Sequence, residues 1–130
     1  MKLLVRHHMS LDEINKSFQK HFPFLKLKCY HADHLTVQRQ YTSEKLHFST
    51  RMVKQIQNSL PAVIEFKSTD TIEEFENLLK KELDLPVSVF RKTNECWVDT
   101  TPTKYLSLEA QNSLGAVQIH EHYNDYTLFL

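Results

Sequence analysis

Histidines are the residues whose number and spacing most suggest chemistry in this sequence, which contains eight of them. His120 and His122 lie two positions apart in an apolar segment, so on a strand both imidazoles would share one face and could bind one metal ion. A metal site needs three or four converging ligands, however, and the chain has no Cys-x-x-Cys pair. We therefore interpret the histidines as surface or capping residues, keep His120 and His122 as the candidate metal ligands, and expect no cofactor.

Cys29 and His31 are two positions apart, so on a strand their side chains would point to the same face. This arrangement could place a thiol nucleophile beside an imidazole base. Cys29 also aligns with the core-facing position of Val89 in the second half of the chain, where a thiol would be inert packing. We expect Cys29 and Cys96 to be buried free thiols in a reducing compartment.

The sequence offers no other catalytic arrangement. Gly115 is the only glycine, which excludes the P-loop, the dinucleotide fingerprint and the nucleophile elbow, because each needs several glycines. The acidic residues 73–76 and the basic residues 80–81 follow the helix dipole, and no pair of carboxylates is fixed by spacing. We therefore expect a protein that is not an enzyme.

Two helices that begin in the same way would carry the scaffold. Ser10 with Glu13, and Thr71 with Glu74, form capping boxes about 61 positions apart. Each box opens an apolar stripe at helical spacing, and the two stripes match at the same offset. The residues of the stripes are Leu11, Ile14, Phe18 and Phe22 in the first helix, and Ile72, Phe75, Leu79 and Leu83 in the second.

Alternating strands surround each helix. Leu3 and Val5 match Ile64 and Phe66 before the helices, and residues 25–29 match 85–89 after them. Further strands are predicted near 35–40 and 96–100, following the turns 32–34 and 93–95.

A third repeat links the ends of the two halves, since residues 57–63 reappear as 111–117. Pro61 and Gly115 occupy the same position after a helix and are both predicted to stop it. We expect an α+β fold with a mostly antiparallel sheet, made by duplication of a strand-helix-strand-strand-helix unit. A single domain of residues 1–130 would contain pseudo-repeats 1–60 and 61–116, and a closing hairpin at 117–130.

Composition places the chain among compact proteins without a strong electric field. Hydrophobic residues make up 41% of the sequence, and the formal net charge is zero, with 16 basic and 16 acidic residues. The apolar run at 3–5 is too short for a signal sequence, and no segment is long enough to span a membrane. We expect a cytoplasmic protein without a membrane partner.

The clearest indication of function is the predicted sheet face that points away from the core. Its side chains are Lys2, Arg6, Lys26, Lys28 and Tyr30 in the first half, and Glu65, Lys67, Ser88 and Phe90 in the second. Lysines and aromatic rings on a sheet can stack single-stranded bases, and they can equally bind a protein. Because the net charge is zero and only the first half is basic, protein binding is the favoured interpretation.

Residues 71–85, 89–101 and 106–115 read as a helix, a hairpin with an aromatic and acidic second strand, and a short helix ending near Gln-Asn. This combination, about a third of the chain, resembles the later half of a group of small bacterial proteins of unknown function. The resemblance implies a bacterial cytoplasmic accessory protein, and it implies no activity, ligand or catalytic residue.

Taken together, these patterns predict a protein that acts by binding another protein or a second copy of itself, with Lys2, Arg6, Lys26, Lys28, Tyr30 and Phe90 as the binding residues. The alternatives are a small-ligand or metal site between the repeats, and binding of single-stranded nucleic acid to the basic, aromatic sheet face.

Overall fold

The computed structural model describes residues 1–6, 9–31, 40–41 and 61–117. These residues form an α+β fold with antiparallel sheets, as predicted. The strands are β1 (Lys2–Val5), β2 (Leu25–His31), β3 (Gln40–Tyr41), β4 (Ala62–Glu65), β5 (Val87–Lys92) and β6 (Trp97–Asp99). The helices are α1 (Leu11–His21), α3 (Ile72–Leu83), the short 3₁₀ helix η2 (Thr101–Thr103) and a C-terminal helix whose described part is 108–117.

The two predicted capping residues begin their helices. The Glu13 amide donates to Ser10 Oγ at 3.2 Å, and the Glu74 amide donates to Thr71 Oγ1 at 3.1 Å. Each bond satisfies a backbone donor that the first helical turn would otherwise leave without a partner. Every residue of the two predicted apolar stripes is buried, so the period read from the sequence is confirmed.

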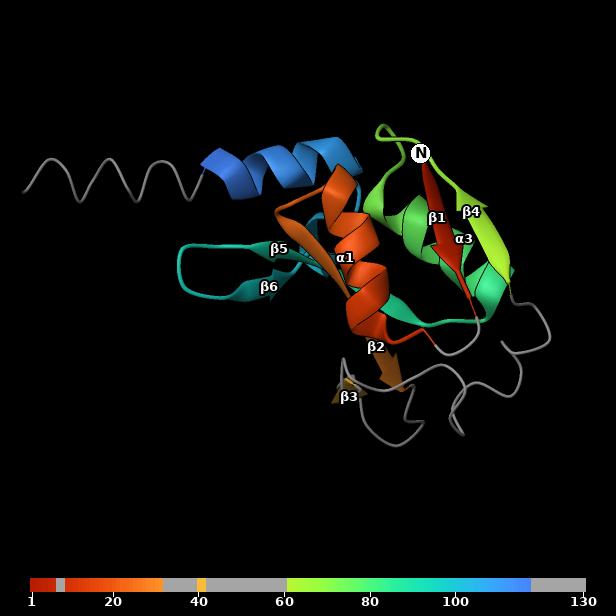
Figure 1. Ribbon diagram of the computed structural model, residues 1–130. Coiled ribbons are helices and arrows are strands. Elements are labelled where there is room, and N and C mark those ends of the chain that lie inside the picture. Colours follow the sequence, from red (N-terminus) through yellow and green to blue (C-terminus); the bar gives the residue numbers. More distant parts are fainter. Residues whose placement is uncertain (7–8, 32–39, 42–60, 118–130) are drawn as a thin grey trace, which may run out of the picture.

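The strands form two sheets rather than one. β1 and β4 make a two-stranded antiparallel ribbon, in which Lys2 pairs with Glu65 and Val5 with Ala62. The other strands make a four-stranded antiparallel sheet in the order β3-β2-β5-β6. Figure 1 shows the ribbon at one end of the molecule and the β5–β6 hairpin at the other.

One apolar core joins the two sheets. Helix α1 contacts β1 and β2, and helix α3 contacts β4 and β5, so each helix bridges the ribbon and the four-stranded sheet. The inner residues of both sheets belong to one buried cluster with the helix stripes; they are Leu3, Val5, Ile64, Leu25, Leu27, Cys29, Val87 and Val89.

Polar side chains fix the helices to the backbone of the central strands. The side chain of the buried Asn15 makes two hydrogen bonds to the backbone of Leu27. Its Oδ1 atom accepts from the Leu27 amide at 2.7 Å, and its Nδ2 atom donates to the Leu27 carbonyl at 2.9 Å. On the other helix, a Glu76 carboxylate oxygen accepts the Val89 amide at 3.0 Å. Because buried backbone groups without partners are costly, these bonds select the position of each helix along its strand.

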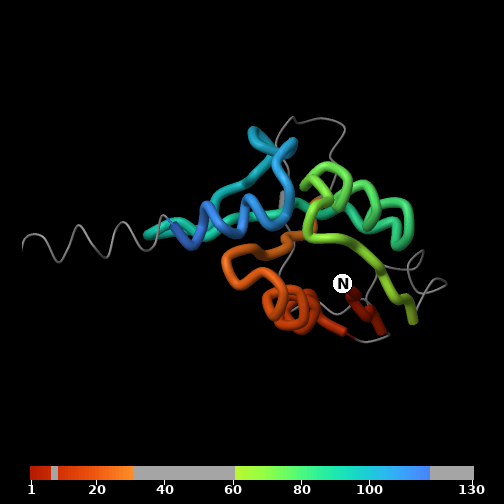
Figure 2. Tube along the Cα trace, turned by 90° about the horizontal axis from the view of Figure 1, so that it is seen from above, coloured from red at the N-terminus to blue at the C-terminus, as the bar shows by residue number. Residues whose placement is uncertain are grey.

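The C-terminal helix runs beside the β5–β6 hairpin, as Figure 2 shows. The Asn112 side-chain oxygen accepts the Phe24 amide at 2.9 Å, and the fully buried Gln111 accepts from Arg91 at 2.7 Å. These contacts anchor the helix to the start of β2 and the end of β5.

The prediction that Gly115 stops this helix is wrong, because helical residues continue through Gly115 to 117. A Cβ at this position would lie 2.7 Å from the Phe24 Cβ and 3.3 Å from the Lys92 carbonyl oxygen. Gly115 therefore serves close approach between helix and sheet, and not a left-handed cap. Within the described ranges, a left-handed residue instead follows α3, where Asp84 has a φ of 51°.

The closing hairpin predicted at 117–130 lies outside the described residues, apart from residue 117, which is helical. The turn predicted at 32–34 and most of the strand predicted near 35–40 also lie outside them, although Gln40 begins β3. The hairpin turn predicted at 93–95 separates β5 from β6, as expected.

Replacing Gly115 by alanine tests the docking of the C-terminal helix. A Gly to Ala change in a helix exposed to water stabilises the fold by about 0.5–1 kcal/mol. Here the added methyl group would collide with Phe24, so we expect destabilisation by about 1–3 kcal/mol in urea unfolding. Ser113→Ala, at an exposed position of the same helix, should change stability by less than about 0.5 kcal/mol. A stabilising Gly115→Ala would show that the helix does not dock.

Candidate binding surface

The outward face of the four-stranded sheet collects lysines and aromatic residues. Lys26 pairs with Phe90, Phe90 pairs with Asp99, and Lys92 pairs with Trp97 across neighbouring strands. Cross-strand partners point to the same side of a sheet. We call this surface, opposite the apolar core, the basic face; it contains Lys26, Lys28, Tyr30, Phe90, Lys92 and Trp97.

Lysine ammonium groups lie over the aromatic rings of the basic face. The Nζ atoms of Lys26 and Lys92 are each 5.0 Å from the centre of the Trp97 ring. The Lys28 Nζ atom is 4.4 Å from the centre of the Phe90 ring. These distances are typical of cation–π contacts, which hold the ammonium groups against the rings of the sheet.

The centre of the basic face is covered, whereas its hairpin end is accessible. Ser88 is 0% exposed and Phe90 is 7% exposed. Lys26, Lys92 and Trp97 are half-buried, and they lie toward the β5–β6 turn. A partner would therefore meet two ammonium groups and one indole ring at this end.

The predicted binding residues belong to two different surfaces. Lys26, Lys28, Tyr30 and Phe90 come together on the basic face, as expected for neighbouring strands. Lys2 does not join them, and neither does Arg6, because β1 pairs with β4 in the separate ribbon. The alternation of the sequence separated the core-facing side chains from those on the opposite face, although Ser88 and Phe90 on that face are buried. Alternation carries no information about which strands pair.

Sequence reasoning missed Lys92 and Trp97. Both follow from the hairpin, because the four-residue loop 93–96 between β5 and β6 brings residue 92 opposite residue 97. Asp99 lies on the same face, at the end of β6. Its Oδ1 atom accepts hydrogen bonds from the Thr101 amide at 2.9 Å and from the Thr101 hydroxyl at 2.6 Å.

The two cysteines have opposite surroundings. Cys29 is 2% exposed, and burial raises the pKa of its thiol to about 12, which keeps it protonated and inert as predicted. The prediction that Cys96 is buried is wrong. Cys96 is exposed because it follows the β5–β6 turn, where its amide donates to Thr93 Oγ1 at 3.2 Å.

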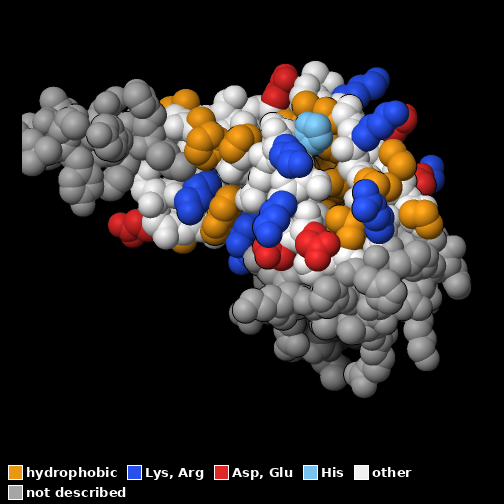
Figure 3. Space-filling model, in the orientation of Figure 1, with side chains coloured by type: hydrophobic (Ala, Val, Ile, Leu, Met, Phe, Trp, Pro, Cys, Tyr) orange, Lys and Arg blue, Asp and Glu red, His pale blue; other side chains and the backbone are white. Residues whose placement is uncertain are grey.

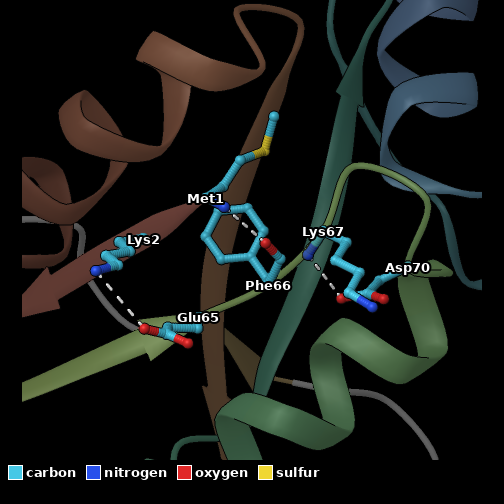
Figure 4. A pocket seen from close by; sticks show the side chains of 6 residues that line it. All are labelled: Met1, Lys2, Glu65, Phe66, Lys67 and Asp70. Atoms are coloured by element: carbon cyan, nitrogen blue, oxygen red, sulfur yellow. Dashed lines mark hydrogen bonds and ion pairs between the residues drawn. The ribbon is translucent and has the colours of Figure 1, made fainter.

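Two hollows are lined by residues from both halves of the chain. One has a volume of about 430 Å³ and lies at the end of the ribbon, between Met1 and Lys2 on one side and Glu65, Phe66, Lys67 and Asp70 on the other (Figure 4). The second, of about 220 Å³, is lined by Tyr30 and by polar residues of α3 together with Lys104. A small-ligand site between the halves remains a prediction.

The metal hypothesis rests on residues outside the described part of the chain, since His120 and His122 both lie there. Among the residues that the structure describes, no group of three or more histidine, cysteine, aspartate or glutamate side chains could hold a metal ion.

The exposures of the two thiols predict their reactivity. With Ellman's reagent at pH 8, Cys96 should react fast, whereas Cys29 should react only after unfolding, because on the order of one thiol in 10,000 is ionised when the pKa is about 12. Cys96→Ser should remove the fast phase and leave the slow one. Two fast phases in the folded wild type would contradict the burial of Cys29.

In the part of the chain that the structure describes, no helix combines the length and the apolar character needed to cross a membrane. Comparison with protein-family models, with curated proteins and with solved structures found no match to this chain.

Proposed function

We propose that the protein is not an enzyme and acts by binding a protein partner through the hairpin end of the basic face. An acidic segment of the partner would lie across Lys26, Lys92 and Trp97. The observation that carries this proposal is the placement of two ammonium groups at 5.0 Å from one indole ring, with a third over the neighbouring Phe90 ring.

Because lysines already lie over the aromatic rings, the basic face favours binding of carboxylates over stacking of nucleic-acid bases. A base needs an open ring face, but Phe90 is 7% exposed and lies beneath Lys28. A base on Trp97 would have to displace lysines that already lie over the ring. A carboxylate, in contrast, can bind an ammonium group that stays over its ring. The zero net charge of the chain also provides no general attraction for nucleic acid.

We also infer that the two halves of the chain are copies of one unit related by a pseudo-twofold axis. Leu3 and Ile64, which match at an offset of 61, are themselves cross-strand partners in the ribbon. Lys28 and Ser88, which match at an offset of 60, are partners in the four-stranded sheet. A twofold axis perpendicular to two antiparallel strands exchanges the strands and passes between one pair of opposite residues. Leu3–Ile64 in the ribbon and Lys28–Ser88 in the four-stranded sheet are such pairs, so the pairing in both sheets supports a twofold relation.

The helix contacts agree with this duplication in part. Asn15 and Glu76 match at the offset of 61, and each side chain binds a backbone amide of the adjacent central strand. The two amides, of Leu27 and Val89, are cross-strand partners but not equivalent positions, because Leu27 matches Val87 at the offset of 60. An experimental structure should allow one rotation of about 180° to superpose α1 on α3 and β2 on β5 together. Separate rotations for the helices and for the strands would contradict the duplication.

We further propose that the protein is an accessory protein of the bacterial cytoplasm. It is supported by the resemblance of residues 71–115 to small bacterial proteins and by the free cysteines, Cys29 and Cys96.

Trp97 provides a direct test of the binding site, because it is the only tryptophan in the chain. Titration with a short Glu-rich peptide in low-salt buffer should change the tryptophan emission, with a Kd on the order of 10–100 µM. The double variant Lys26→Ala, Lys92→Ala should weaken binding by about tenfold or more, since it removes both ammonium groups near the indole.

The control is the double variant Lys16→Ala, Lys20→Ala, which removes the same charge from exposed positions of α1. It should bind the peptide as the wild type does. Equal losses in both double variants would indicate attraction by net charge alone. Tight binding of oligothymidylate with no response to the peptide would replace the protein partner by single-stranded nucleic acid.

A further inference from the structure

The outer face of the β1–β4 ribbon combines exposed apolar side chains with one pair of opposite charges. Along both strands the inner residues are buried or, for Ala62, half-buried, whereas Lys2, Leu4, Val63 and Glu65 are exposed. Leu4 pairs with Val63 across the ribbon, and their exposed fractions are 37% and 57%. Lys2 pairs with Glu65 in the next row, so an apolar pair lies directly beside a charged pair.

This concentration of apolar side chains needs an explanation. Figure 3 shows hydrophobic side chains bordered by basic and acidic ones on the side of the molecule where β1 and β4 lie. Single exposed apolar residues are ordinary on protein surfaces, but a contiguous group with a polar border is typical of an interaction site.

We propose that this face binds the same face of a second copy of the chain. A twofold axis that runs along the ribbon, between its strands, would place β1 of one copy over β4 of the other. Lys2 of each copy would then face Glu65 of its partner, and Leu4 would face Val63. The pattern is complementary to itself, which a pattern of like charges could not be.

The charged pair is loosely held within one chain. The Lys2 Nζ atom lies 3.7 Å from a Glu65 carboxylate oxygen, and the two side chains are 71% and 74% exposed. Both line the rim of the 430 Å³ hollow at the end of the ribbon, as Figure 4 shows. An exposed pair of this length contributes little to folding, so its members are available to pair across an interface.

Opposite charges within the face favour a second copy as the partner. Lys2 and Glu65 contribute one charge of each sign, so each meets an opposite charge on a like face, and the exposed Arg6 and Lys67 lie just beyond the ends of β1 and β4. The whole chain has zero formal net charge, so two copies do not repel each other at a distance. Because the face is small, the dimer should be weak, with a Kd on the order of 10–100 µM.

Sedimentation velocity over a range of concentrations should show the wild type converting from monomer to dimer. Lys2→Glu places like charges opposite each other twice across the twofold axis, and Glu65→Lys does the same, so each variant should weaken the dimer by at least about tenfold. An equimolar mixture of these two variants restores opposite charges at both contacts, and it should dimerise as the wild type does.

The mixture separates this interface from effects within one chain, because mixing cannot relieve a repulsion between residues 2 and 65 of the same molecule. Val63→Lys should also abolish the dimer, whereas Val117→Lys, at a residue 50% exposed on the C-terminal helix, should leave it unchanged. Thermal melts of all variants establish that they are folded.

Two results would overturn the proposal. The first is a wild type that stays monomeric at millimolar concentration. The second is a dimer that Lys2→Glu, Glu65→Lys and Val63→Lys do not weaken, since its interface would then lie elsewhere.

Discussion

A cluster of phenylalanine rings at the centre of the core holds the two sheets together. Phe18 of α1 stacks on Phe75 of α3 with their centres 5.4 Å apart, and Phe66, just after β4, approaches Phe75 at 5.1 Å. Phe22 joins the cluster from the end of α1, at 5.5 Å from Phe18. A two-stranded ribbon is marginally stable in water by itself. Its inner face becomes part of the fold because these rings and the helix stripes bury it.

This packing decides which surfaces remain for partners. The helices occupy the inner faces of both sheets, so the basic face of one sheet and the outer face of the ribbon point away from the core. Polar contacts refine the arrangement without enlarging the core, since Asn15 fixes α1 against Leu27, and Gln111 joins the C-terminal helix to Arg91. Both side chains are buried, so their bonds select one position of each helix and disfavour others.

The two candidate surfaces differ in chemistry and in place. The hairpin end of the basic face carries ammonium groups on an indole ring, whereas the ribbon carries an apolar pair beside opposite charges. They lie at opposite ends of the molecule in Figure 1. Association through the ribbon would therefore leave both hairpin ends accessible, and a dimer would offer two equal sites to a partner with repeated acidic segments. Such bivalence raises the effective affinity without any new contact.

The sequence by itself determined the local elements. These elements depend on neighbours in the chain, so they can be predicted from the sequence alone. The signals are the capping residues Ser10 and Thr71, the helical spacing of apolar residues and the alternation along the strands. The same local signals separated inward residues from outward ones, including the buried Cys29.

Only the tertiary structure decided which strands pair and what covers each face. The separation of Lys2 and Arg6 from Lys26, the burial of Phe90, and the close contact at Gly115 all depend on residues distant in sequence. Alternation fixes the side of a strand on which a residue lies but not the neighbour of that strand. A glycine that ends a helix and a glycine that admits a neighbouring backbone also look alike in sequence, because both require only the absence of a side chain.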